Sequence, residues 1–207
     1  MGNKTTKEVL QRIRDTLNTA RLGLKDVLDG PQRRLGGLRN LIVFGRAVTN
    51  VLQNLRSTEP TFDEWYAPYV AEMKADPLLK YLYELRTKIL KEGMLGTSSS
   101  GYIRHFEYPK DMQRLGPPPV GAQGFFMGDQ SGGSGWDVLL DDGTVEKFYV
   151  DIPGDIGTFS VHLGDAPTDH RGQPPTDNTI QAIAQAYFDY LSSMVNAAEK
   201  QFGAHGV

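Results

Sequence analysis

The spacing of the apolar residues changes twice along the chain. Up to Gly93 they recur every three or four residues, as on the buried face of an amphipathic helix. Short runs of aromatic and β-branched residues separated by Gly, Pro and Ser follow, and the helical spacing returns in residues 180–198. This order predicts an α+β fold with an N-terminal antiparallel helical bundle, an antiparallel β-meander and a long C-terminal helix that packs back on the bundle. We expect the bundle at 1–93, the meander as an insertion at 94–162, and a polar loop and the last helix at 163–207.

Turn and capping residues divide the first part of the chain into four predicted helices. The second helix is expected to begin near Arg33 and to lie antiparallel to the first. Gly45 stands on its apolar seam and indicates a close helix crossing, because glycine destabilises a helix by roughly 1 kcal/mol relative to alanine. The boundary signals are the capping-box pairs Thr5/Glu8 and Thr61/Glu64, the break at Gly30-Pro31, the Asp76-Pro77 cap and the terminal Gly93.

The dipeptide Asp142-Gly143 is the clearest β signal. It separates the runs WDVLLD and TVEKFYVD, and Asp-Gly is typical of a two-residue hairpin loop. Before it, Trp136, Val138 and Leu140 alternate with polar residues, as in a strand with one buried face. We therefore predict a hairpin centred on this dipeptide.

The chain has no cysteine among its 207 residues. It therefore has no disulfide framework, no thiolate nucleophile and no sulfur-ligated metal site, which is typical of proteins from a reducing compartment. The sequence also has no apolar run long enough to cross a membrane. We expect a cytoplasmic protein with no cofactor and no membrane association.

Positive charge is concentrated towards the N-terminus. Residues 1–57 carry 11 Lys or Arg against 4 Asp or Glu, a net charge of +7, although the whole chain has a net charge of −3. Such asymmetry is consistent with a surface that faces nucleic acid, or with two parts of one protein that attract each other. The lack of a dense basic block favours the second interpretation. The candidates for phosphate contacts with RNA are Arg33, Arg34, Arg39, Arg46 and Arg56.

A glycine-rich run occupies residues 128–135. Consecutive backbone N–H groups in such a run can bind phosphate. However, no Gly-Lys-Ser/Thr follows it, and the next predicted element is a strand, whereas phosphate-binding motifs lead into a helix. A hairpin loop is therefore the favoured interpretation. The candidate ligand-binding residues are Gly128, Asp129, Ser131 and Ser134.

Two histidines and two aspartates lie close together in and beside the polar loop after the last predicted strand. Imidazole and carboxylate groups are metal ligands. Their spacing matches no metal motif, and a hydrogen-bonded loop explains them equally well, so no metal site is predicted. The four candidates are His162, Asp165, Asp169 and His170.

Four tyrosines fall at helical spacing with leucines in the third and fourth predicted helices. Aromatic side chains in such positions more often pack in helix interfaces than stack on nucleic-acid bases. We expect core positions for Tyr66, Tyr69, Tyr81 and Tyr83.

The segment DPLLKYLYELRTKILKEG at residues 76–93 resembles the last core helix of HEPN-type proteins, in which a leucine-arginine-asparagine stretch runs towards a histidine and a glycine. The resemblance extends over residues 5–93. It implies a helical bundle that is often dimeric and, in many members, a metal-independent ribonuclease of toxin-antitoxin or antiviral systems. The histidine is missing after Arg86, so the resemblance implies a non-catalytic relative; the residues left for catalysis are Arg86 with Lys91 or His105. The chain also resembles a recurring group of bacterial proteins to which no activity is attached.

Three functional hypotheses follow. The favoured one is a non-catalytic interaction or regulatory protein that forms a homodimer or docks a protein partner, because no complete catalytic set is present. The second is a HEPN-type ribonuclease toxin or antiviral effector. The third is a small-ligand or nucleotide sensor, built between the glycine-rich run and the loop that carries His162 and His170.

Overall fold

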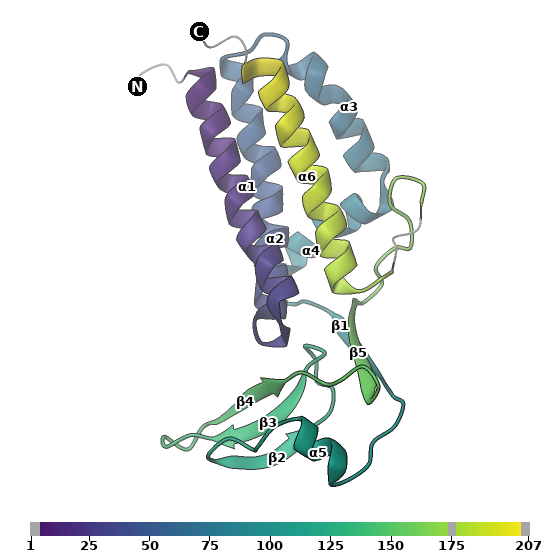
Figure 1. Cartoon of the computed structure of the whole chain (residues 1–207). Helices are drawn as coiled ribbons and strands as arrows, with labels where there is room; N and C mark the ends of the chain where they lie inside the picture. The colour runs from purple at the N-terminus through teal and green to yellow at the C-terminus, as the bar shows by residue number, and fades with distance from the viewer. Residues whose placement is uncertain (1–4, 174–176, 204–207) are drawn as a thin grey trace.

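The computed structural model describes residues 5–173 and 177–203 and confirms the predicted α+β class. The helices lie side by side in a bundle, with the strands and a short helix at one end of it (Figure 1). None of the helices in these ranges is both long and apolar enough to cross a membrane. The helices are α1 (Thr6–Asp29), α2 (Pro31–Leu52), the 3-10 helix η1 (Gln53–Ser57), α3 (Phe62–Ala75), α4 (Pro77–Glu92), α5 (Lys110–Arg114) and α6 (Ile180–Phe202). The strands are β1 (Thr97–Ile103), β2 (Ala122–Phe126), β3 (Ser134–Leu139), β4 (Val145–Val150) and β5 (Gly157–Leu163).

Most of the predicted helix boundaries are confirmed. Thr5 and Glu8 form a complete capping box, and Gly93 ends α4 in the left-handed conformation, with φ of 67°. The Thr61 cap is wrong: its side chain makes no capping hydrogen bond, because its backbone is not in the extended conformation that an N-cap side chain needs. Helix α2 begins at Pro31, two residues before the expected Arg33, since proline fits the first helical position.

The core is formed mainly where α1 and α6 pack against α2. The expected close crossing at Gly45 is confirmed, because a Cβ added there would lie 2.5 Å from Cε1 of Tyr187 and 2.9 Å from Cδ1 of Leu191. A second close approach joins α1 to α2, where a Cβ on Gly23 would lie 2.7 Å from the carbonyl oxygen of Gly37. The glycines thus bring the helix backbones closer together than larger residues would allow.

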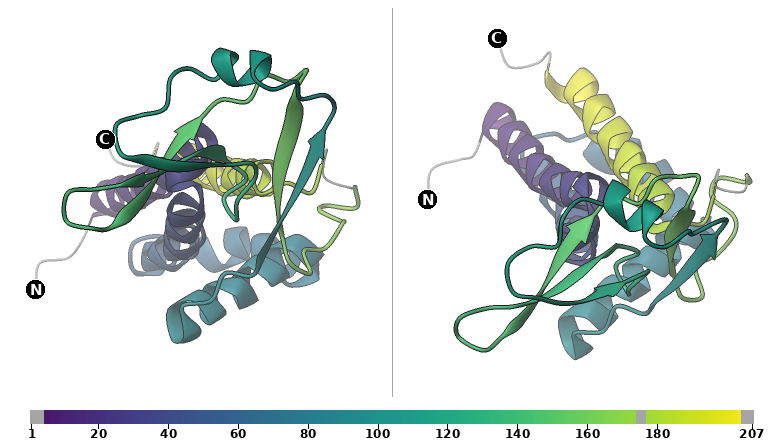
Figure 2. Two further views of the ribbon diagram at one scale, coloured as in Figure 1. Left: turned by 90° about the horizontal axis from the view of Figure 1, so that it is seen from below. Right: turned by 60° about the horizontal axis from the view of Figure 1, so that its bottom comes forward.

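Strands β2, β3 and β4 confirm the predicted antiparallel meander, and the structure adds a second antiparallel sheet that was not predicted. Strands β2, β3 and β4 make a three-stranded sheet, whereas β1 pairs with β5, from Thr97 opposite Leu163 to Ile103 opposite Gly157 (Figure 2). The partner of β1 lies far along the chain, and strand periodicity carries no information about such distant pairing.

The predicted β3–β4 hairpin is confirmed, but its loop is longer than two residues. The N–H of Leu140 donates to the carbonyl of Thr144 at 2.8 Å, which leaves three residues in the loop. Gly143 has φ of 82°, as in three-residue loops that combine a type I turn with a left-handed residue. The alternation before the turn is only partly reflected in burial: Val138 is buried, whereas Leu140 is exposed.

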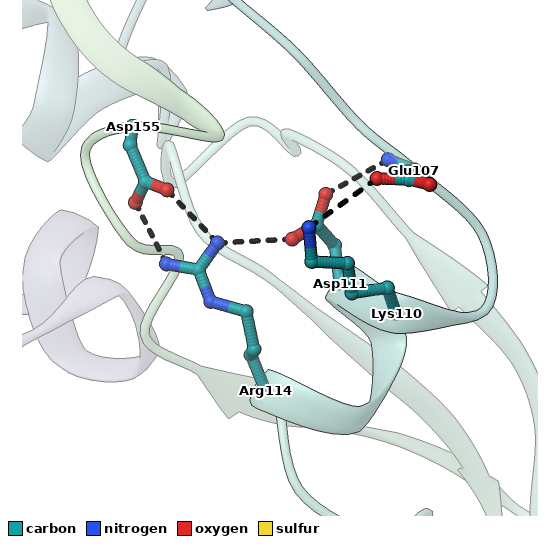
Figure 3. Close-up of polar contacts among 5 residues, drawn as sticks. All are labelled: Glu107, Lys110, Asp111, Arg114 and Asp155. Carbon is teal, nitrogen blue, oxygen red and sulfur yellow. Dashed lines mark hydrogen bonds and ion pairs between the residues drawn. The ribbon is translucent and has the colours of Figure 1, made fainter.

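Helix α5 is held to the β4–β5 connection by Arg114 (Figure 3). Its guanidinium makes two hydrogen bonds of 2.8 Å to the carboxylate of Asp155 and one of 2.9 Å to Asp111. The other carboxylate oxygen of Asp111 accepts the backbone N–H of Glu107 at 2.8 Å. The hydrogen bond from Glu107, followed by that from Arg114, holds the pKa of Asp111 below its usual value. The hydrogen bonds from Arg114 likewise lower the pKa of Asp155.

Candidate functional site: a cationic cavity beside α3

A cavity of about 590 Å³ lies between α3 and helices α2, α4 and α6. Helix α3 is held to the bundle at both of its ends. Near its start, Phe62 and Trp65 pack on Phe202 of α6, with ring centroids 6.3 and 5.2 Å apart. At its end the chain turns at Asp76 directly into α4. The lining residues include Arg46, Thr49, Tyr66, Val70, Met73, Lys74, Leu79, Lys80, Tyr83, Glu84, Tyr187, Tyr190 and Leu191.

The inner wall of the cavity is apolar and aromatic. Tyr66, Tyr187 and Tyr190 are buried, and burial raises the pKa of each phenol, so that the hydroxyl groups stay neutral and can donate hydrogen bonds. The Tyr190 side chain is 4% exposed, and its hydroxyl finds no hydrogen-bond partner within the described ranges. Buried hydroxyl groups are normally paired, so this hydroxyl is an unused donor in the wall of the cavity.

Cations gather at the rim of the cavity. The Arg46 guanidinium donates to the Thr49 hydroxyl at 2.7 Å and lies over the ring of Tyr83, 5.1 Å from its centroid. In the part of the chain that the structure describes, neither this guanidinium nor the ammonium groups of Lys74 and Lys80 form an ion pair. Glu84 is the one acidic lining residue, so the cavity has an excess of positive charge.

The far side of Tyr190 is covered by the loop that precedes α6. The Arg171 guanidinium lies over the Tyr190 ring at 5.6 Å from its centroid and donates to Glu72 at 2.8 Å. The backbone N–H of Arg171 donates to Asp76 at 2.6 Å. The loop is therefore joined both to the end of α3 and to one wall of the cavity.

The glycine-rich run forms the loop between β2 and β3, which confirms the hairpin interpretation. Its backbone donors are used within the loop. Asp129 Oδ1 accepts the N–H groups of Ser131 at 2.9 Å and Gly133 at 3.0 Å, and the N–H of Gly128 donates to the Ser134 hydroxyl at 3.0 Å. An internal carboxylate thus takes the position in which a phosphate would be bound by such a loop.

The same aspartate connects the loop to the sheet. Asp129 Oδ2 accepts hydrogen bonds from Lys147 at 3.0 Å and from the hydroxyl of Tyr149 at 2.7 Å. Burial alone would raise the pKa of Asp129, but these hydrogen bonds and that of Gly133 outweigh burial and lower it. Arg34 of α2 donates to the carbonyl of Ser131 at 2.5 Å and so links the loop to the bundle.

The histidine candidates have separate partners. His162 lies within hydrogen-bond distance of Ser100 and of the Asn178 carbonyl, each at 3.2 Å. His170 lies 3.1 Å from Asp76. Within residues 5–173 and 177–203, no group of three or more His, Cys, Asp or Glu could hold a metal, and this includes Asp165 and Asp169.

The residues singled out for catalysis do not form a common hydrogen-bonded site. The Nε atom of Arg86 is buried without a hydrogen-bond partner among the described residues. The backbone N–H of His105 donates to the carbonyl of Ile156 at 3.4 Å, and Lys91 lies in the last turn of α4. None of the three histidines makes a hydrogen bond with Arg86.

The arginines proposed for RNA contacts are also dispersed. Arg33 pairs with Asp26 at 3.1 Å, Arg56 pairs with Asp63 at 2.6 Å, and Arg39 donates to the carbonyl of Gly93. The structure therefore places Arg46 and Arg56 at the cavity, Arg34 at the junction with the β2–β3 loop, and Arg33 and Arg39 in local contacts.

Sequence reasoning missed most of the cavity residues. Helical periodicity marked Tyr187 as a core residue but could not show that a cavity borders it. The core expectation was wrong for Tyr83, which is 53% exposed beneath the Arg46 guanidinium. The available signal was the pair Lys74 and Lys80, one at the end of α3 and one at the start of α4, because they lie on either side of the cap at Asp76.

Comparison with known proteins corrects the resemblance proposed from the sequence. Residues 25–106 match the family model described as Bacteriophage lambda protein ea47, and this stretch contains Arg86, Lys91 and His105. The resemblance to bacterial HEPN-type proteins was therefore wrong: leucines and one arginine at helical spacing occur in many amphipathic helices. No curated protein and no solved structure matches the chain. The segment that supplies the α2, α3 and α4 walls of the cavity is thus similar to the bacteriophage lambda protein ea47 family.

Proposed function

We propose that this chain is a non-catalytic binding protein whose cavity beside α3 receives a small anionic molecule with an apolar body. The observation that carries the proposal is the combination of an aromatic inner wall with rim cations that have no carboxylate partner. A volume of about 590 Å³ falls in the range of small-molecule sites. The ligand would bury its apolar part against Leu79 and Leu191.

The polar groups of the cavity define how the ligand would be oriented. Arg46 is partly buried and already fixed by Thr49 and Tyr83, so its guanidinium is preorganised for a carboxylate, sulfonate or phosphate. Lys80 is exposed and adds attraction at the rim. The unpaired hydroxyl of Tyr190 can donate to an ether, carbonyl or hydroxyl oxygen of the ligand.

The test uses anilinonaphthalene sulfonate, a fluorescent anion with an aromatic body, and the full chain. We expect one saturable site. Arg46→Gln should weaken binding about tenfold, because a charge-assisted hydrogen bond contributes about 1.5–3 kcal/mol. Lys88→Gln is the matched control: Lys88 is an exposed cation on α4 that does not line the cavity, and its loss should leave the affinity unchanged.

Tyr190→Phe separates binding from folding. Removing an unpaired buried hydroxyl should leave the free energy of unfolding unchanged or raise it, while a ligand that accepts a hydrogen bond from Tyr190 binds more weakly. The proposal is overturned if the native chain shows no saturable binding, or if Arg46→Gln and Lys88→Gln bind the probe equally well. Circular dichroism of each variant establishes that the fold is retained.

A further inference from the structure

Strand β1 forms one edge of a two-stranded sheet. One more hydrogen bond lies just past each end of the β1–β5 pairing. The N–H of Arg104 donates to the Ile156 carbonyl at 2.8 Å, and the N–H of Gly164 donates to the Gly96 carbonyl at 3.0 Å. Because hydrogen-bonding direction alternates along an antiparallel strand, the even-numbered residues of β1 turn their backbone groups towards β5. The odd-numbered residues turn theirs outwards: Thr97, Ser99, Gly101 and Ile103.

This outer edge has none of the usual protection. The strand TSSSGYI has no charged residue and no proline, and all of its residues except Thr97 are exposed. Figure 2 shows no helix or strand along the side of β1 opposite β5 in the described part of the chain. Natural proteins cover or charge such edges, and a ribbon of only two strands has marginal stability. An unprotected edge of this length is a site for strand addition.

We infer that the occupant of this edge is β1 of a second copy of the chain, paired antiparallel about a two-fold axis at Ser100. The outward residues are symmetric about that position, so Thr97 faces Ile103 of the second copy and Ser99 faces Gly101. Each of these pairs has outward N–H and C=O groups on both strands, as a hydrogen-bonded antiparallel pair requires. The result is a continuous four-stranded sheet, β5–β1–β1–β5.

The charges and the surrounding surface fit a second copy. No like charges meet, because β1 is uncharged. Large apolar side chains are exposed on the strand, on α4 and in the connection between them: Tyr102 is 65% exposed, Leu90 54% and Met94 60%. Pairing of two copies would bring these residues towards one interface and remove apolar surface from water.

A cysteine pair tests the register directly, because the native chain has no cysteine. In the inferred dimer, the two copies of residue 100 form a non-hydrogen-bonded pair with Cα atoms about 4.5 Å apart, within disulfide range. The two copies of residue 98 are roughly 13 Å apart, beyond that range. We expect Ser100→Cys to form a disulfide-linked dimer under mild oxidation about tenfold faster than Ser98→Cys.

Sedimentation equilibrium of the full chain tests the dimer without a cross-link. Ser99→Pro removes an outward N–H and leaves the bonds to β5, so it should lower the dimer fraction, whereas the control Ser99→Ala keeps the N–H and should retain it. A native chain that is monomeric throughout a concentration series overturns the inference. A monomer is also the result expected if the β1 edge binds a strand of another protein. Equal cross-linking of Ser98→Cys and Ser100→Cys overturns the register.

Discussion

The Nδ1 atom of His170 lies 3.1 Å from the Oδ2 atom of Asp76, across 94 positions of the chain. The same carboxylate caps α4 by accepting the N–H of Leu79 at 2.8 Å, and it accepts the N–H of Arg171 at 2.6 Å. Burial tends to raise the pKa of Asp76, but the hydrogen bonds from Leu79, Arg171 and His170 together lower it. One buried carboxylate therefore both starts a helix and fixes the loop beside the cavity.

Replacing this carboxylate should give a pH-dependent loss of stability. Asparagine retains one oxygen that can cap α4, so Asp76→Asn removes the charge together with the second acceptor oxygen, which contacts Arg171 and His170. We expect the free energy of unfolding to fall by about 2 kcal/mol at neutral pH, since hydrogen bonds to a charged group contribute about 1.5–3 kcal/mol. Because the native pKa is lowered, this contribution is present above the unfolded pKa of about 3.9 and is lost as the pH falls through the native value.

Urea unfolding at several pH values measures this effect. The difference between the native chain and Asp76→Asn should shrink in acid. Asp169→Asn, in the same loop but without a hydrogen bond to Asp76, should have little effect at any pH. A difference that stays constant from neutral to acid pH would show that the charge of Asp76 does not stabilise the fold.

The Asp129 carboxylate should likewise control the β2–β3 loop. Asp129→Asn weakens the acceptor for the N–H groups of Ser131 and Gly133, so hydrogen exchange at both amides should accelerate. Burial and the Asp129 contact raise the pKa of Tyr149 to about 12, and in the variant that pKa should fall towards the ordinary value near 10. NMR titration and amide exchange measure the two effects. Asp137→Asn on β3 is the control and should change neither.

The sequence predicted the features that are specified locally. The Thr5/Glu8 capping box and the left-handed Gly93 depend on neighbouring residues, and both are confirmed. The Thr61 cap had the right spacing but failed, because spacing does not fix the backbone conformation at the cap itself. Local patterns are therefore reliable only where the backbone at that position is also determined locally.

The cavity and the β1–β5 pairing depend on packing at long range. Apolar periodicity assigns Tyr187 to a buried face, but the same pattern arises whether a helix or an open space lies opposite. The space beside α3 is lined by residues of α2, α3, α4 and α6, which lie far apart along the chain. No single segment contains that information.

The close approach at Gly45 predicts opposite effects of two alanine substitutions on α2. Gly45→Ala would place a Cβ 2.5 Å from the ring of Tyr187, so we expect a loss of about 1–3 kcal/mol from overpacking despite the better helix propensity. Gly36→Ala meets no atom within 4 Å and should stabilise the protein by about 0.5–1 kcal/mol. Thermal or urea unfolding distinguishes them. Equal effects of the two substitutions would contradict the close packing of α2 on α6.

The Arg114 contacts should decide how firmly α5 is held. Arg114→Gln removes the ion pairs with Asp155 and Asp111, so amide exchange over residues 107–115 should accelerate, while exchange in the bundle helices stays unchanged. Arg114→Lys should not restore protection, because an ammonium group cannot make the paired hydrogen bonds that the guanidinium makes with Asp155 (Figure 3).

Asp155→Asn provides the graded comparison for this clamp. It weakens only one of the two carboxylate contacts, and the bond from Arg114 to Asp111 remains, so the increase in exchange should be smaller than in Arg114→Gln. Because Asp111 also accepts the N–H of Glu107, that amide should remain protected in Asp155→Asn and lose part of its protection in Arg114→Gln. Equal exchange of the Glu107 amide in both variants would mean that the Asp111 carboxylate is positioned without the help of Arg114.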